Sequence, residues 1–359
     1  MKDKEVILPF YAKASIFIVG LIGSFAILYI TQWILIPLVF AVIIAMVLHP
    51  VVFFLVRRKM NRIVAIIAIL VLSFLLLAAF GLLLYTQASQ FSQSWPTLVD
   101  KFTNLLNLSI TNAASYFDIN PQLIHDGLTK IRIELINGSS TLIGQTLISV
   151  GSGVAMLFLI PVYVFILLFY QPLLMEFIHL LFIKNNQSQV KEIITQTKTL
   201  IQHYLIGLFI EFILVATLYS ITLFLLGINY AILLGIIGAL LNVIPYIGGI
   251  VGTALPMMVA FVTKDSGWYP IYVLVIYYVI QLIDNHYIVP WIVASKVKIN
   301  ALFSILAVFV GNALWGVAGM FLAIPMLAII KLIFDHIEPL KSWGFLLGNT
   351  TTSRVKKEN

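Results

Sequence analysis

Apolar runs long enough to cross a membrane make up most of this 359-residue sequence. A membrane-spanning helix needs about 20 consecutive apolar residues. Runs of this kind lie at about residues 14–31, 33–56, 63–87, 146–170 and 201–227, followed by a compound stretch at 229–335. Charged residues make up only 10% of the chain, whereas soluble domains hold about 25%. The sequence therefore predicts an all-α integral membrane protein.

The residues and motifs that the sequence lacks exclude several classes of function. There is no cysteine, which excludes disulfides, thiolate metal sites and a cysteine nucleophile. No P-loop or His-Glu-x-x-His motif is present, so we expect neither ATP coupling within this chain nor an enzyme. The net charge of +7 lies in loops and termini, and a nucleic-acid partner is not expected. The first apolar run leads into the second without a cleavage site, so it should remain as a span.

Basic residues in the short loops predict the orientation of the spans, because Lys and Arg mark the cytoplasmic side. The loop at 57–62 holds four basic residues and no acidic one, so we expect it inside the cell. The first two spans then form a hairpin with a tight turn near residues 31–33 outside. Residues 88–145 also lie outside, with amphipathic helices predicted at 92–108 and 120–136. They form either a packing layer or a ligand lid. Both termini are expected in the cytoplasm.

Two uncharged segments, residues 229–263 and 300–330, are too long to cross the membrane once. As straight helices they would measure about 45–50 Å, against a hydrocarbon core of about 30 Å. Pro245 and paired glycines interrupt the first, and Gly311 and Gly316 interrupt the second. We therefore expect about six full spans plus two re-entrant helical hairpins, at 229–263 and 300–335. Full crossing of both segments is the alternative.

The two halves that contain these hairpins resemble each other. A span with one carboxylate precedes each interruption: Glu211 comes before Asn242, and Asp284 comes before Asn312. This order is typical of an inverted repeat, whose broken helices meet at the substrate site. We predict a scaffold at 1–200, including the outside helical region at 88–145, a transport domain at 201–335 and a cytoplasmic tail at 336–359.

Glu211 and Asp284 are the leading candidates for a functional site. A carboxylate at bilayer depth costs several kcal/mol unless it is paired, protonated or in a wet cavity. Glu211 is expected nearer the surface than Asp284, within reach of His203. The alternative is a polar clamp that only holds helices together. The candidate substrate- or ion-binding residues are Glu211, Asn242, Pro245, Tyr246, Gly248, Gln281, Asp284, Asn285 and Asn312.

Three motifs resemble those of the AI-2E transporter family, a bacterial group that includes autoinducer-2 exporters. They are Asn242-Val-Ile-Pro-Tyr-Ile-Gly-Gly, Gln281-Leu-Ile-Asp-Asn-His-Tyr-Ile-Val-Pro290 and Gly311-Asn-Ala-Leu-Trp-Gly-Val-Ala-Gly-Met-Phe-Leu-Ala-Ile-Pro325. The family often has Glu where this chain has Asp284. The resemblance implies a multi-pass transporter of the bacterial inner membrane with an elevator-like movement. It also implies a homo-oligomer, with a pentamer as one candidate assembly.

The residues and the resemblance together predict a secondary transporter that exports a small polar solute, such as a quorum-signalling molecule. Coupling to an ion gradient needs no cofactor beyond H⁺ or Na⁺. A sodium(lithium)/proton antiporter is one alternative, since some relatives resemble such antiporters. A structural membrane protein without transport is the other. That alternative predicts a sealed interior around Asp284, whereas a carrier predicts a cavity that solvent reaches.

Single cysteines in place of Lys264 and Lys296 test the predicted hairpins in this cysteine-free chain. Re-entrance of both hairpins puts Lys264 outside and Lys296 inside. A membrane-impermeant maleimide should therefore label the two variants from opposite faces of the membrane. Labelling of both from one face would contradict the hairpins.

Overall fold

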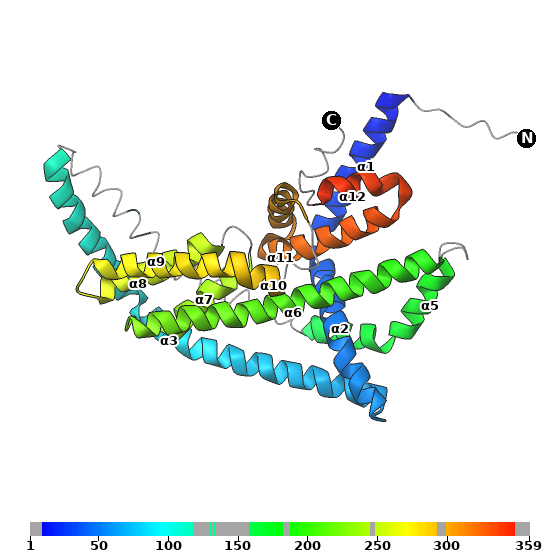
Figure 1. Cartoon of the computed structure of the whole chain (residues 1–359), viewed down its shortest axis with the longest axis horizontal. Coiled ribbons are helices and arrows are strands. Elements are labelled where there is room, and N and C mark those ends of the chain that lie inside the picture. Colours follow the sequence, from blue (N-terminus) through cyan, green and yellow to red (C-terminus); the bar gives the residue numbers. More distant parts are fainter. Residues whose placement is uncertain are drawn as a thin grey trace, which may run out of the picture. The chain divides into compact units, whose positions relative to one another are not determined.

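The computed structural model is helical along nearly all of the chain that it describes. It describes residues 9–117, 130, 133, 158–181, 187–244, 248–292 and 299–348. The labelled elements are α1 (Phe10–Ile30), α2 (Gln32–Arg57), α3 (Arg62–Phe117), α5 (Gln171–Leu181), α6 (Gln187–Leu225), α7 (Ala231–Asn242), α8 (Gly248–Thr263), α9 (Trp268–Ile283), η2 (Asp284–Ile288), α10 (Val289–Ile292), α11 (Ala301–His336), η3 (Glu338–Leu340) and α12 (Lys341–Leu347). Figure 1 shows these elements along the chain.

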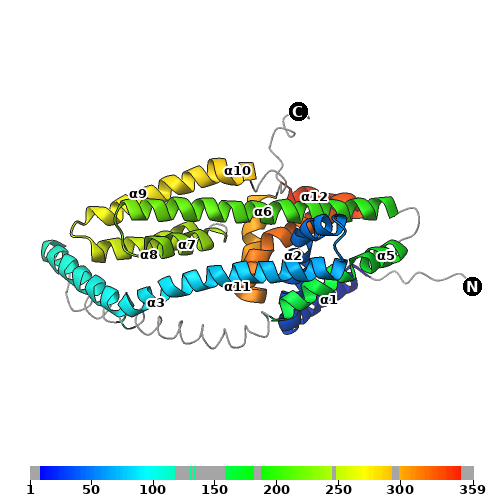
Figure 2. The same ribbon diagram turned by 90° about the horizontal axis from the view of Figure 1, so that it is seen from below.

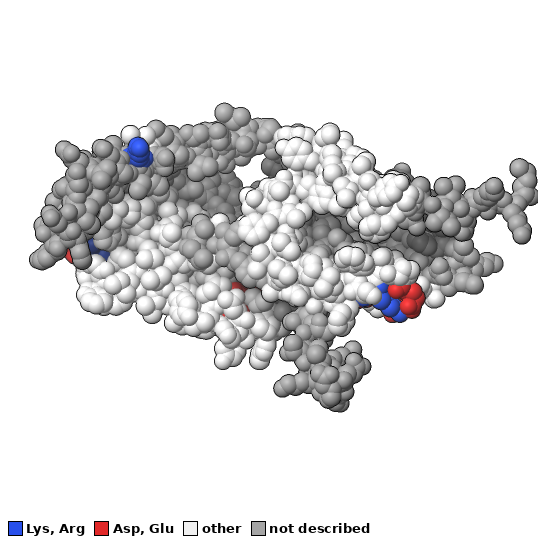
Figure 3. Space-filling view, turned by 90° about the horizontal axis from the view of Figure 1, so that it is seen from above, with Lys and Arg blue, Asp and Glu red and all other residues white. Residues whose placement is uncertain are grey.

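Within the described ranges, six helices are long and apolar enough to cross a membrane. They are Phe10–Ile30, Gln32–Arg57, Arg62–Leu108, Gln187–Leu225, Trp268–Ile292 and Ala301–His336. A seventh span is added if the bent pair Phe158–Phe169 and Gln171–Ile178, which meet at 63°, counts as one. Most of the described surface in Figure 3 is neither basic nor acidic. The predicted class, an all-α membrane protein, is confirmed.

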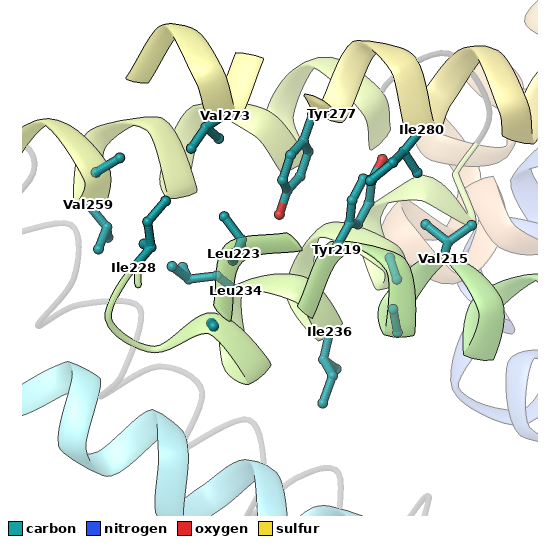
Figure 4. Close-up of a cluster of buried hydrophobic side chains, with 14 of the residues drawn as sticks. Val215, Tyr219, Leu223, Ile228, Leu234, Ile236, Val259, Val273, Tyr277 and Ile280 are labelled. Atoms are coloured by element: carbon teal, nitrogen blue, oxygen red, sulfur yellow. The ribbon is translucent and has the colours of Figure 1, made fainter. Parts of the chain in front are cut away.

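Residues 45–298 form one compact unit, in which α6, α7, α8 and α9 lie side by side (Figures 1 and 2). The core between them is built from buried aliphatic side chains around two stacked tyrosines (Figure 4). The rings of Tyr219 on α6 and Tyr277 on α9 are parallel, with centroids 4.0 Å apart. Leu223, Leu234 and Val273 surround them and are almost completely buried. This core holds together α6, the α7–α8 pair and α9, which carry the candidate site described below.

Helices α7 and α8 form the first predicted hairpin. They pack against each other closely, because a Cβ atom added at Gly252 would lie 3.2 Å from the Cα atom of Gly238. Small residues allow this approach of two helix backbones. The uncharged segment 229–263 is therefore two half-helices, as expected from its interruption.

Helix α3 differs from the prediction, because it continues for 56 residues without a break. The predicted span and the first outside helix are one helix, with Pro96 in its interior. Packing against the first hairpin supports this continuation: Phe102 lies edge-on to Phe261 at 5.9 Å, and Tyr230 Oη donates to Ser94 Oγ at 2.7 Å. These contacts favour the packing layer for this part. The second predicted outside helix, 120–136, lies outside the described residues apart from Lys130 and Ile133.

Residues 1–44 and 299–359 form the other compact unit, which contains α11. Its backbone leaves helical geometry at Trp315 and Gly316, and Gly316 has a positive φ of 58°. The chain doubles back there, because a Cβ atom added at Gly311 would overlap the carbonyl oxygen of Gly319, and the reverse also holds. In a straight helix, residues eight apart lie about 12 Å from each other. The second segment is therefore also a bent pair of half-helices.

The predicted tight hairpin of the first two spans is wrong. A single residue, Thr31, separates α1 from α2, whereas reversing two helices takes a loop of about 2–5 residues. Backbone hydrogen bonds of helical spacing also remain at the junction, from Thr31 N to Ile27 O and from Leu35 N to Thr31 O. The described part of α1 packs against α11, and Trp315 Nε1 donates to Leu28 O at 3.0 Å. The location of the N-terminus stays a prediction.

Candidate functional site

Asp284 lies at the start of a π-helical turn inside the span Trp268–Ile292. Such turns widen an α-helix locally and often occur at functional sites. Pro290 lacks the N–H group that would donate to the carbonyl of His286 in an α-helix. Its absence favours the wider hydrogen-bond spacing of the π-helical turn. Only 2% of Asp284 is exposed. Its Oδ2 atom accepts a hydrogen bond from Asn242 Nδ2 at 2.8 Å, whereas Oδ1 has no partner among the described residues.

The tip of the first hairpin packs against this part of α9. Asn242 is the last residue of α7, and buried Gly248 opens α8. Gly249 leaves room for Gln281, since a Cβ atom added there would lie 2.9 Å from Gln281 Oε1. The same oxygen accepts a weak hydrogen bond from Tyr219 Oη at 3.4 Å. The hairpin tip, α6 and α9 thus share one buried polar cluster.

Glu211 joins this cluster from α6 and is 6% exposed. It is close enough to Asp284 for the two carboxylates to interact electrostatically, and α6 contacts η2 directly. Glu211 lies fourteen residues before Leu225 and Asp284 sixteen after Trp268, or about 21 and 24 Å from those helix ends. The loops at these two ends lie together. The two acids therefore lie at similar distances from these neighbouring helix ends, and the expectation that Glu211 lies nearer the membrane surface stays a prediction.

The expected pairing of Glu211 with His203 is not seen in the described structure. His203 is exposed, and its Nδ1 atom lies 2.8 Å from Thr199 O. Within the described ranges, no ion pair involves Glu211 or Asp284, and no group of three or more His, Asp and Glu residues could hold a metal ion. The cluster therefore has two acidic groups with neutral neighbours.

The structure does not add the remaining candidate residues to this cluster. Asn285 is exposed although it follows Asp284 directly. Asn312 is exposed on α11, in the other compact unit. Pro245 and Tyr246 lie outside the described residues. The structure thus brings together Glu211, Asn242, Gly248, Gln281 and Asp284.

The sequence analysis missed the tyrosines that line this cluster. Tyr204 and Tyr219 lie seven residues before and eight residues after Glu211, and Tyr277 lies seven before Asp284. Residues at these spacings share one face of a helix, so the pattern could have been read from the sequence. All three are buried, and Tyr277 Oη has no hydrogen-bond partner among the described residues.

Comparison with known proteins agrees with a membrane transport protein. The model of the AI-2E family transporter matches residues 16–338. Over 327 residues the chain is 24% identical to "Putative transport protein YrrI" of Bacillus subtilis (strain 168), covering 87% of this chain and 89% of that protein. It is also 24% identical over 329 residues to "AI-2 transport protein TqsA" of Escherichia coli (strain K12), covering 88% and 90% of the two.

The helical spans and the extent of the family match define a multi-pass membrane protein of a transporter class, not an enzyme. The chain belongs to the AI-2E family of transporters.

Replacement of Asn242 by Ala tests the hydrogen bond at the centre of the cluster. The variant leaves a buried carboxylate without its donor, which costs about 1–3 kcal/mol. We expect a lower midpoint of thermal unfolding for the detergent-purified protein. Asn285→Ala is the matched control, because it removes an exposed amide next to the same acid. Equal midpoints for Asn242→Ala and the parent protein would contradict the described contact.

Proposed function

We propose that the protein is a secondary transporter that moves a small polar solute across the inner membrane of a bacterium, driven by a gradient of H⁺ or Na⁺. The observation that carries this proposal is the Oδ1 atom of Asp284, which is buried in a membrane span beside a broken helix and has no hydrogen-bond partner among the residues that the structure describes. A carboxylate in that position needs a proton, a cation or water, so it suits the binding of a coupling ion.

Asn242 links the state of this acid to the hairpin. Its Nδ2 atom donates to Asp284 Oδ2, and a charged acceptor makes a stronger hydrogen bond than a neutral one. A proton on Asp284 therefore weakens the contact between the tip of α7 and η2. Ion binding can thus bias the position of the hairpin, which is what coupling of ion and solute requires.

The solute would bind where the hairpin interrupts the helical backbone. Gly248 and Gln281 supply backbone and amide groups there, next to the acidic pair. Irregular backbone at membrane depth is tolerated where it lines a cavity. We propose that residues 201–335 move against the spans of residues 1–200 in an elevator-like way, and that the two hairpins form an inverted repeat.

Export of a quorum-signalling molecule is the proposed direction and cargo. Support comes from the name of TqsA, an AI-2 transport protein that matches most of this chain. The proposed assembly is a homo-oligomer, such as a pentamer, with both ends of each chain in the cytoplasm. The basic loop at 57–62 supports a cytoplasmic location for the end of α2.

A sodium(lithium)/proton antiporter is the second candidate. It is favoured by the proximity of Glu211 to Asp284 without an ion pair to either in the described structure. Two neighbouring carboxylates repel each other when both are charged, and a bound monovalent cation or proton relieves this repulsion. Exchange of Na⁺ for H⁺ at one pair would then be the transport reaction itself.

Transport by proteoliposomes tests the role of Asp284. We expect Asp284→Asn to abolish gradient-driven movement of radiolabelled autoinducer-2, and of Na⁺ against H⁺ followed with an internal pH dye. Folding should persist, because an Asn side chain still accepts from Asn242. Glu211→Gln should weaken transport without abolishing it, since the Asn242–Asp284 bond remains.

Asp265→Asn provides the control, because it makes the same change at an exposed loop position. Wild-type transport and wild-type pH dependence in Asp284→Asn would contradict the coupling role and leave a packing clamp. Transport of only one of the two probes would distinguish the solute carrier from the antiporter.

A further inference from the structure

A second polar cluster, separate from the acidic one, lies where α2, α3, α5 and α6 approach each other. Lys198 Nζ on α6 lies 3.1 Å from His49 Nδ1 on α2. Arg62, at the start of α3, donates from Nη2 to Leu168 O at 2.6 Å and to Gln171 Oε1 at 3.4 Å. The charges of Lys198 and Arg62 both act on His49. These residues form one connected group, which we call the basic junction: His49, Arg62, Gln171 and Lys198.

The basic junction has two basic side chains, Arg62 and Lys198, and no acidic partner among the described residues. Its contacts are to an imidazole, a carbonyl and an amide, and the ion pairs of the described residues lie elsewhere, one within α11 and one between η3 and α12. All four side chains are half-buried, so water screens their charges less than on an open surface. Arg and Lys in such a setting favour a phosphate, which accepts charge-assisted hydrogen bonds from both.

The surroundings of the basic junction favour a phosphate that carries acyl chains. The chain bends by 63° at Tyr170, and α5 then presents Leu173, Phe177 and Leu180, each at least 56% exposed. Exposed apolar side chains next to basic groups are typical of a helix in the membrane interface. The end of α2 adds Arg57 and Arg58, whose guanidinium groups lie over phenylalanine rings at 5.0 and 4.8 Å.

We propose that the basic junction binds the headgroup of an anionic phospholipid. The phosphate would accept hydrogen bonds from Arg62 and Lys198, and the acyl chains would lie along α5. Basic groups between spans on the cytoplasmic side are suited to anionic headgroups, and the loop at 57–62 marks that side by its charge. Figure 2 shows α5, the first turns of α6 and the start of α3 at the same end of their unit.

Bound lipid would connect the membrane composition with α6, the helix that carries Glu211. Lys198 precedes Glu211 by thirteen residues on this helix, or about 20 Å. The lipid site itself does not depend on transport, and its test uses binding and stability alone.

The test measures retention of dioleoylphosphatidylglycerol by the full-length purified protein, using native mass spectrometry and thermal unfolding. The wild-type protein should retain this lipid and unfold at a higher temperature with it than with dioleoylphosphatidylcholine. Lys198→Gln keeps a donor for His49 but loses the charge, and should bind phosphatidylglycerol about tenfold more weakly. Lys198→Arg should retain it. Lys191→Gln, which removes an exposed charge from the same helix, is the matched control.

Three results would overturn the proposal. The first is equal retention of the two lipids by the wild-type protein. The second is an equal loss of phosphatidylglycerol retention in Lys191→Gln and Lys198→Gln. The third is a rise in unfolding temperature with inorganic phosphate alone that equals the rise with phosphatidylglycerol. The last result would indicate a site for a free anion. If Lys198→Gln does not fold, Arg62→Gln replaces it, because Gln can still donate to Leu168 O. The comparison of lipids in the wild-type protein decides the question independently of either variant.

Discussion

The hydrogen bond from Asn242 to Asp284 is the contact on which the candidate site depends. An acid buried in a membrane span needs a partner, because lipid offers none. Here the partner comes from the tip of a broken helix and bonds one carboxylate oxygen. The other oxygen has no partner within the described ranges, which suits the proposed binding of a proton or a cation. A single side-chain pair therefore joins the buried acid to the first hairpin, the element that we propose moves with the solute.

The packing around this pair explains how a polar group can be held at depth. Stacked Tyr219 and Tyr277 and the aliphatic core fix α6 against α9, and glycines let α7 and α8 approach closely. The extension of α3 packs against the outer ends of the same hairpin. The described part of the tip contacts the acid through Asn242, so the tip is the part of the hairpin that we expect to respond to an ion. The basic junction lies on the same unit but uses other residues and a different chemistry.

Much of this arrangement could be predicted from the sequence, because charge in a membrane span is rare and informative. The lone acids Glu211 and Asp284 and the interruption after Asn242 were sufficient to identify the cluster. The similar distances of the two acids from the neighbouring ends of α6 and α9 could not be predicted, since they depend on where α6 ends. The continuity of α3 through Pro96 was missed because tertiary contacts outweighed a local helix-breaking residue. The junction at Thr31 was predicted as a reversal because charge rules report sides of the membrane and not helix geometry.

Infrared difference spectroscopy of the purified protein in lipid would test most directly whether Asp284 binds a proton beside Asn242. The account predicts a C=O stretching band of a protonated carboxyl group that changes with pH and shifts in frequency when aspartate is labelled with ¹³C. The band should be absent from Asp284→Asn and displaced in frequency in Asn242→Ala. A wild-type spectrum without a pH-dependent aspartic-acid band, or a band unaffected by both substitutions, would contradict the account.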